Sequence, residues 1–98
     1  MAELNKLIHE PARLHILTYL GKNEENDVSF SEFKKELGIS SGNLSVQLNK
    51  LQDVNYIKID KRFKDKRPLT SIIITSAGVN ALDLYFGEME KLIISFRE

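Results

Sequence analysis

Residues 40–54, SSGNLSVQLNKLQDV, decide the fold that this sequence predicts. Ser40 stands where its hydroxyl can accept a hydrogen bond from a free amide in the first turn of a helix. Apolar side chains then recur with the helical repeat and form a single stripe: Leu44, Leu48, Leu51 and Val54. We therefore predict a helix that begins after Ser40 and packs this stripe against a core.

The opposite face of this helix is polar but almost uncharged. It carries serine and asparagine, which are mediocre helix formers, in place of the glutamate and lysine that favour a solvated helix. Short donors and acceptors of this kind can approach a rigid partner closely and hydrogen-bond the edges of DNA bases. A face that is merely solvated is the alternative interpretation. The candidate DNA contacts are Ser40, Ser41, Asn43, Ser45, Val46, Gln47, Asn49 and Lys50.

A shorter helix is predicted just before the central one. Ser29 and Glu32 have the S-x-x-E spacing of a capping box, which marks the start of a helix. Gly38 ends this helix and opens the short turn that leads to Ser40. Two short helices joined by a glycine-containing turn of this length form a helix-turn-helix, which we predict over about residues 29–54.

A further helix is predicted over about residues 11–20. Pro11 suits the first turn, and Gly21 suits the position just after the last. Residues 4–8 precede this helix as a short helical or irregular lead-in that carries apolar side chains.

The segment after the central helix predicts a β-hairpin. Residues 55–60, NYIKID, alternate with period two, and a second apolar run follows at about residues 69–75. The charged loop KRFKDKRP joins the two strands, so that they form a wing over about residues 55–75. Phosphate contacts are predicted for the cations of this wing: Lys61, Arg62, Lys64, Lys66 and Arg67.

The C-terminal stretch predicts one long helix over about residues 76–97, with Thr75 as its N-cap. Its apolar residues recur three and four positions apart as far as Phe96, as in a heptad seam. This seam exceeds what a small three-helix core needs, so we expect it to pair with a second copy of the chain. A helix that only covers the core of a monomer is the alternative. The predicted dimer contacts combine both ends of the chain: Leu4, Leu7, Ile8, Leu82, Phe86, Met89, Ile93 and Phe96.

Together these elements predict an α+β fold, mostly α, of the winged helix-turn-helix type. We expect a single domain over residues 1–98, with a three-helix core, a two-stranded β-wing and a long C-terminal dimerisation helix. A chain of this length buries roughly 65% of its unfolded surface, which is enough for one core.

Charge is balanced overall but unevenly distributed. The chain has 14 basic and 14 acidic residues, whereas residues 50–74 alone carry seven cations and three anions. A local basic patch on a neutral domain is the expected electrostatic footprint of a nucleic-acid-binding surface.

Several classes of function are disfavoured by composition. The chain has no Cys, hence no disulfide framework and no thiolate metal site. No signal-peptide pattern and no membrane-spanning window is found, and we expect a cytoplasmic protein without membrane contact. The two histidines, His9 and His15, are six positions apart and lack a carboxylate partner at ligand spacing. We therefore predict no enzyme activity, no metal site and no cofactor.

Three stretches of the chain resemble the winged-helix transcriptional regulators of the MarR and ArsR type. Residues 10–17, EPARLHIL, are similar to the P-x-R-L-x-I-L opening of ArsR-like domains. Residues 37–51, followed by the NYI of residues 55–57, resemble their helix-turn-helix. The DKR of residues 65–67, leading to the ITSAG of residues 74–78, resembles the D-x-R…L-T-x-x-G ending of the MarR wing.

This resemblance spans about residues 7–80 and implies a homodimer with two recognition helices and two wings on duplex DNA. It implies that Arg67 is the wing arginine that enters the minor groove or binds phosphate. The residues that it places toward the major groove are Ser41, Asn43, Ser45, Val46 and Gln47.

We therefore predict a sequence-specific, double-stranded-DNA-binding transcriptional regulator. The alternative is a winged helix that serves protein–protein interaction without reading DNA. Residues 58–67 carry six cations against two acids, which favours DNA because an apolar protein interface has no use for them. RNA is disfavoured because its A-form major groove does not admit a helix. No small-molecule effector is indicated, and neither the operator nor the direction of regulation follows from the sequence.

Overall fold

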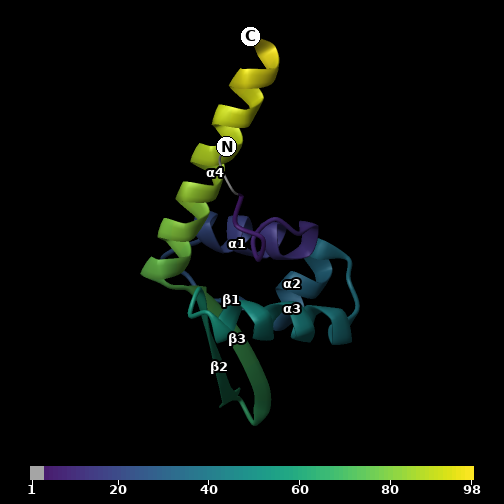
Figure 1. The fold of residues 1–98 in the computed structure, drawn as a ribbon. Helices are drawn as coiled ribbons and strands as arrows, with labels where there is room; N and C mark the ends of the chain where they lie inside the picture. Colours follow the sequence, from purple (N-terminus) through teal and green to yellow (C-terminus); the bar gives the residue numbers. More distant parts are fainter. Residues whose placement is uncertain (1–3) are drawn as a thin grey trace.

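A β-hairpin and a long helix project in opposite directions from a helical body in the computed structural model, which describes residues 4–98 (Figure 1). The principal extents are 57 × 25 × 21 Å, so the molecule is markedly elongated. The elements in chain order are α1 (Pro11–Lys22), β1 (Val28–Ser29), α2 (Phe30–Leu37), α3 (Ser41–Asp53), β2 (Ile57–Lys64), β3 (Arg67–Ile74) and α4 (Ser76–Arg97). The predicted fold class is confirmed.

One apolar core lies where α1, α2, α3, the base of the sheet and the first half of α4 meet. The stripe predicted for the central helix supplies three of its fully buried side chains: Leu44, Leu48 and Leu51. Val54, the fourth member of that stripe, is exposed because the helix ends at Asp53 and Val54 is its C-cap. The prediction that Val54 faces the core is therefore wrong.

The first helix is longer than predicted. It ends at Lys22, because Asn23 caps the last turn. The Asn23 backbone amide donates to the Leu20 carbonyl at 3.0 Å, and its side-chain amide donates to the Tyr19 carbonyl at 2.8 Å. Gly21 is thus inside the helix and not beyond its end. A Cβ at Gly21 would lie 3.4 Å from a methyl group of Leu82, which is an ordinary van der Waals contact, so the packing of α4 on α1 does not require glycine here.

The two helices of the helix-turn-helix begin and end as predicted. The Ser29 hydroxyl accepts a hydrogen bond from the Glu32 amide, and the Ser40 hydroxyl accepts one from the Asn43 amide, both at 3.1 Å. Gly38 adopts φ +63°, the left-handed conformation that closes α2. These local contacts fix the turn that orients α3.

Only half of the expected capping box forms. The Glu32 carboxylate accepts a hydrogen bond from the Tyr19 hydroxyl, a contact that ties α2 to α1. This hydrogen bond raises the pKa of Tyr19 to about 12.

The sheet has three strands in the order β1-β3-β2, and not the two that were predicted. Val28 pairs with Ile72 and Ser29 with Ser71 in antiparallel register. The extra strand lies immediately before α2, so the helix-turn-helix is joined to the base of the wing by backbone pairing.

The strands of the hairpin are longer than predicted, and the loop between them is shorter. Lys64 pairs with Arg67, which leaves only Asp65 and Lys66 in the turn. Both have positive φ, at +53° and +66°, as a type I′ turn requires. Most of the charged segment read as a loop is therefore paired strand, with its cations held on two defined faces.

The start of α4 is anchored on the start of β2. The Thr75 hydroxyl accepts from the Gly78 amide at 3.0 Å, which confirms the predicted cap, and donates to the Asn55 carbonyl at 2.6 Å. A Cβ at Gly78 would collide with the Tyr56 carbonyl oxygen, so only glycine allows this close approach. Even α4, the longest helix in the described part of the chain, lacks the apolar character needed to cross a membrane.

Candidate nucleic-acid interface

The polar face of α3 lies open to solvent. Seven of the eight residues predicted to contact DNA from this helix or its cap are exposed: Ser40, Ser41, Asn43, Ser45, Val46, Asn49 and Lys50. The Ser40 oxygen is occupied as an acceptor by the cap, which leaves its hydroxyl hydrogen for a further partner. The helix therefore presents short polar side chains around one half-exposed apolar residue, Val46.

Gln47, the eighth residue, has two partners within the chain. Its carbonyl oxygen accepts a hydrogen bond from Arg13 at 2.6 Å, and its amide donates to the Asn43 side chain at 3.0 Å. Gln47 thus holds the position of Asn43 and links the polar face of α3 to the interior. Base contact by Gln47 itself stays a prediction, and it requires that one of these two bonds be exchanged.

Arg13 is a buried cation whose role the sequence did not indicate. Its Nε donates to the Leu7 carbonyl at 2.5 Å, while one terminal nitrogen binds Gln47 and lies 3.7 Å from the Glu10 carboxylate. Arg13 belongs to the EPARLHIL motif, but that motif does not predict a contact with Gln47, which is 34 positions away. This one side chain forms hydrogen bonds that link the lead-in, α1 and α3.

Glu10 caps α1 with its carboxylate. It accepts hydrogen bonds from the amides of Ala12 at 3.2 Å and Arg13 at 2.9 Å. Partial burial raises the pKa of Glu10, but these amide hydrogen bonds and the charge of Arg13 outweigh it, so the pKa lies below its ordinary value. The cap also fixes the backbone from which Arg13 reaches α3.

A groove joins α3 to the wing. Its volume is about 260 Å³, and it is lined from α2, α3 and both long strands by Phe30, Ser45, Leu48, Asn49, Ile59, Lys61 and Thr70. Lys61 therefore lies on the side of the wing that faces the recognition helix. Because side chains alternate along a strand, Arg62 and Lys64 lie on the opposite side.

The five predicted wing cations are all exposed but differ in their partners. Arg62 lies 3.3 Å from the Asp27 carboxylate and 3.6 Å from that of Asp60, so its charge is largely compensated. Within the described chain, the other four cations form no ion pair shorter than 4 Å: Lys61, Lys64, Lys66 and Arg67. A phosphate contact by Arg62 is the least favoured of the five, because its two carboxylates would have to be displaced.

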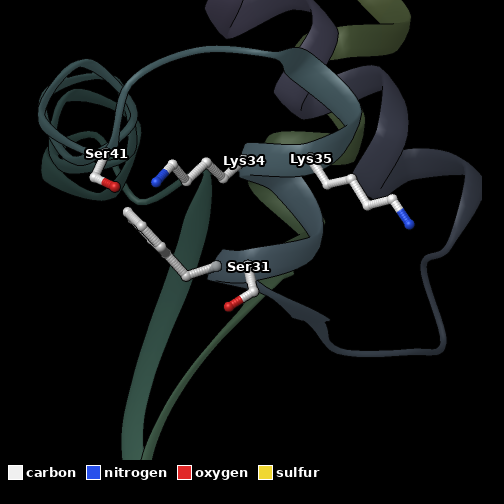
Figure 2. Close-up of a pocket in the computed structure, with 5 residues that line it drawn as sticks. Ser31, Lys34, Lys35 and Ser41 are labelled. Atoms are coloured by element: carbon white, nitrogen blue, oxygen red, sulfur yellow. The ribbon is translucent and has the colours of Figure 1, made fainter.

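A second depression, of about 440 Å³, lies between α2 and the start of α3 (Figure 2). Its lining residues are Phe30, Ser31, Lys34, Lys35 and Ser41. The Lys34 side chain extends toward Ser41, whereas Lys35 points away to the other side of α2 (Figure 2). Sequence reasoning missed Lys34 because it treated α2 as a support for α3 and not as part of the surface beside it.

The residues predicted to form a dimer contact fall into three groups. Ile8 and Leu82 are 0% and 8% exposed and belong to the core of the single chain, so the prediction that they contact a second copy is wrong for these two. Both lie on amphipathic segments, and the apolar pattern does not show that the core of the same chain covers them. Leu4, Leu7 and Met89 are half-buried against the same core. The exposed remainder is Phe86, Ile93 and Phe96, with Leu92 beside them.

The histidines are not gathered into a site. His9 shares a hydrogen bond of 2.7 Å with the Tyr85 hydroxyl, which ties the lead-in to α4, and His15 is exposed. Within residues 4–98 no cluster of three or more potential metal ligands occurs.

A helix-turn-helix with an exposed polar second helix, followed by a cationic two-stranded wing, defines a winged-helix protein. The family model described as "Winged helix DNA-binding domain" matches residues 12–93. The chain belongs to this family. A comparison with curated protein sequences finds no match.

Solved structures with the same fold include a transcriptional regulator homologue from Pyrococcus horikoshii OT3. It is 26% identical with a TM-score of 0.85, and the match covers 92% of this chain and 87% of that one. The heme sensor PefR from Streptococcus agalactiae, in complex with heme, is 22% identical with a TM-score of 0.78 over 93% of this chain and 62% of its own. The S. aureus MepR–DNA complex is 16% identical with a TM-score of 0.75 over 94% of this chain and 73% of MepR. The likeness to winged-helix regulators seen in the sequence motifs is thereby confirmed.

Proposed function

We propose that this protein is a transcriptional regulator that binds double-stranded DNA as a homodimer. One observation carries the proposal: the uncharged polar face of α3 and the cationic wing border the same groove, lined by Ser45 and Asn49 from the helix and Lys61 from the wing. A polyanionic duplex is the partner whose shape and charge fit both sides of such a groove.

In the proposed complex α3 enters the major groove, whose width admits one helix. Ser41, Ser45 and Asn49 are spaced four apart and form one polar line along α3, with Val46 beside it. Hydroxyl and amide groups hydrogen-bond base edges, and Val46 supplies an apolar surface suited to a thymine methyl group. Asn43, held by Gln47, is pre-ordered for such a contact.

The cations around α3 bind the backbone and set the register of the helix. On the wing side these are Lys61, Lys64, Lys66 and Arg67, of which Arg67 is the candidate for the minor groove. On the other side, Lys34 reaches the depression at the start of α3 (Figure 2). Phosphate contacts on both flanks would position the helix, and the polar line of α3 would specify the sequence.

Dimerisation is proposed through the exposed apolar face of α4. Phe86, Ile93 and Phe96 lie on one side of this helix and extend beyond the core that covers its first half. Pairing around a two-fold axis would bury these side chains and present two copies of α3 to half-sites about one DNA turn, ~34–36 Å, apart. The existence of a DNA complex of MepR, a protein of similar fold, supports DNA as the partner.

The test is fluorescence anisotropy of a random-sequence duplex at several salt concentrations. Each phosphate contact contributes a slope of about −0.9 to log K against log salt, so Lys64→Ala/Arg67→Ala flattens the slope by about two per bound chain. Lys91→Ala, which removes one exposed cation from α4, leaves the slope unchanged. Absence of wild-type binding at low salt would overturn the proposal and favour a winged helix that binds another protein.

A further inference from the structure

Phe63 is a large apolar side chain that does not pack in the core. It lies near the end of β2 and is 76% exposed, although aromatic side chains normally supply buried area. The residues that precede it by four and two positions, Ile59 and Lys61, both line the groove against α3. Because alternate residues share one face of a strand, Phe63 lies on the same face, about 6.6 Å beyond Lys61.

The partner of Phe63 across the hairpin is Pro68. The two-residue turn makes Lys64 and Arg67 the hydrogen-bonded closing pair, so Phe63 and Pro68 occupy the next, non-hydrogen-bonded pair. A proline at this position loses no ladder bond, and its ring lies on the same face of the hairpin as the aromatic side chain. The result is a stiff apolar edge at the end of the wing, on the side of the recognition helix.

The charge around this edge determines what it can contact. Lys61 lies on the same face, Lys66 lies in the adjoining turn, and Lys64 and Arg67 lie on the opposite face of the same two strands. These four cations have no ion-pair partner within residues 4–98. An apolar protein surface would have to desolvate them without compensation. The minor groove of DNA accepts both the ring and the cations, because its deoxyribose walls offer the ring an apolar surface and the phosphates along its edges attract the cations.

We propose that Phe63 is an apolar wedge that contacts the DNA minor groove and partly unstacks one base step beside the half-site read by α3. This inference rests on the proposed DNA-binding function and adds a sequence preference to it. Unstacking costs least at pyrimidine–purine steps, TA and CA. The protein would therefore select such a step at a fixed distance from the central site, at a position that α3 does not reach.

The experiment is selection from a random duplex pool with wild-type protein, Phe63→Ala and Phe63→Leu in parallel. The wild type should enrich TA or CA steps flanking a central motif. Phe63→Ala should retain the central motif, lose the flanking preference and bind the wild-type optimum about tenfold more weakly. Phe63→Leu, which keeps an apolar wedge, should retain most of the preference. Since Phe63 is exposed, both variants should keep the wild-type melting temperature.

Salt dependence and base fluorescence separate the possible outcomes. Phe63→Ala should leave the slope of log K against log salt unchanged, whereas Arg67→Ala should flatten it by about one per chain. With 2-aminopurine at the selected step, the wild type should raise the fluorescence and Phe63→Ala should not. If Phe63→Ala retained the flanking preference, the proposal that Phe63 acts as a wedge would be overturned. Failure of the wild type to bind any duplex would instead overturn the proposed function.

Discussion

The wing and the C-terminal half of α4 project from opposite ends of the same body (Figure 1). Both expose side chains that the core does not bury. The wing concentrates six cations against two acids in residues 58–67. The end of α4 instead exposes apolar side chains, and Phe96 near its end is 90% exposed. Cations without ion-pair partners favour a polyanionic partner. Exposed apolar side chains instead favour contact with a second apolar surface. We therefore propose different partners for the two ends.

The largest expected effect comes from changing the chemistry of the α4 end. Ile93→Glu/Phe96→Glu places charge on the face proposed to pair, so the protein should sediment as a monomer. Loss of the second recognition helix should weaken binding to a two-site duplex by about a hundredfold, because the two sites no longer act together. Sedimentation velocity and anisotropy measure the two consequences.

Leu84→Glu is the matched control for this prediction. Leu84 is 71% exposed and lies nine residues before Ile93, two and a half turns away and therefore on the opposite side of α4. This variant should remain a dimer and keep its DNA affinity. If Leu84→Glu dissociates the protein and Ile93→Glu/Phe96→Glu does not, the pairing face has been assigned to the wrong side.

A smaller effect is expected at the tip of the wing. Asp65 and Lys66 both have positive φ, so Lys66→Gly would create the Asp-Gly pair that a type I′ turn favours. Because glycine adopts positive φ without strain and lysine does not, this change should raise the free energy of unfolding by about 1 kcal/mol. The loss of one cation should at the same time flatten the salt slope of DNA binding by about one per chain.

Lys66→Ala separates these two consequences, because it removes the same charge and keeps a side chain in the left-handed conformation. It should show the change in salt slope without the gain in stability. Denaturation with urea, together with anisotropy, would measure both. A stabilised Lys66→Ala would show that the gain arises from charge and not from backbone conformation.

The smallest effect is expected in the helical body, at the Glu10 cap of α1. The folded-state pKa of Glu10 lies below its ordinary value of 4.5, so its contribution is present above that pH and is lost as pH falls through the folded pKa. Glu10→Gln should cost about 1 kcal/mol near pH 7, and its stability should converge with that of the wild type toward pH 3. Thermal unfolding between pH 3 and 7 measures this, with Glu25→Gln in the exposed loop as the unaffected control.

Local chemistry explains what the sequence could predict. Caps and turns depend on residues three or four positions apart, and for that reason Ser29, Ser40, Thr75 and Gly38 mark their helices correctly. The amphipathic stripe of α3 likewise identifies its buried face. The candidate DNA surface follows from these elements, because the exposed face of a capped helix is whatever its apolar stripe leaves over.

What was missed depends on pairing across the chain. Val28 pairs with Ile72, and Arg13 with Gln47, at separations that no local pattern encodes. Ile8 and Leu82 show the same limit: each is apolar on an amphipathic segment, and only the packed structure decides whether its partner belongs to the same chain or another. The sequence likewise does not predict roles for Lys34 and Phe63, because these depend on the start of α3 and the groove face of the wing that lie beside them in the fold.

The collision that would follow from any side chain at Gly78 makes the base of α4 a fixed pivot. From that pivot the helix runs 22 residues, a lever of about 33 Å. A tilt of only 10° at the pivot moves its far end by about 6 Å, roughly the rise of two base pairs along DNA. In a two-fold assembly the angle set by one glycine against one carbonyl oxygen would thus determine how far apart the two DNA-reading surfaces stand.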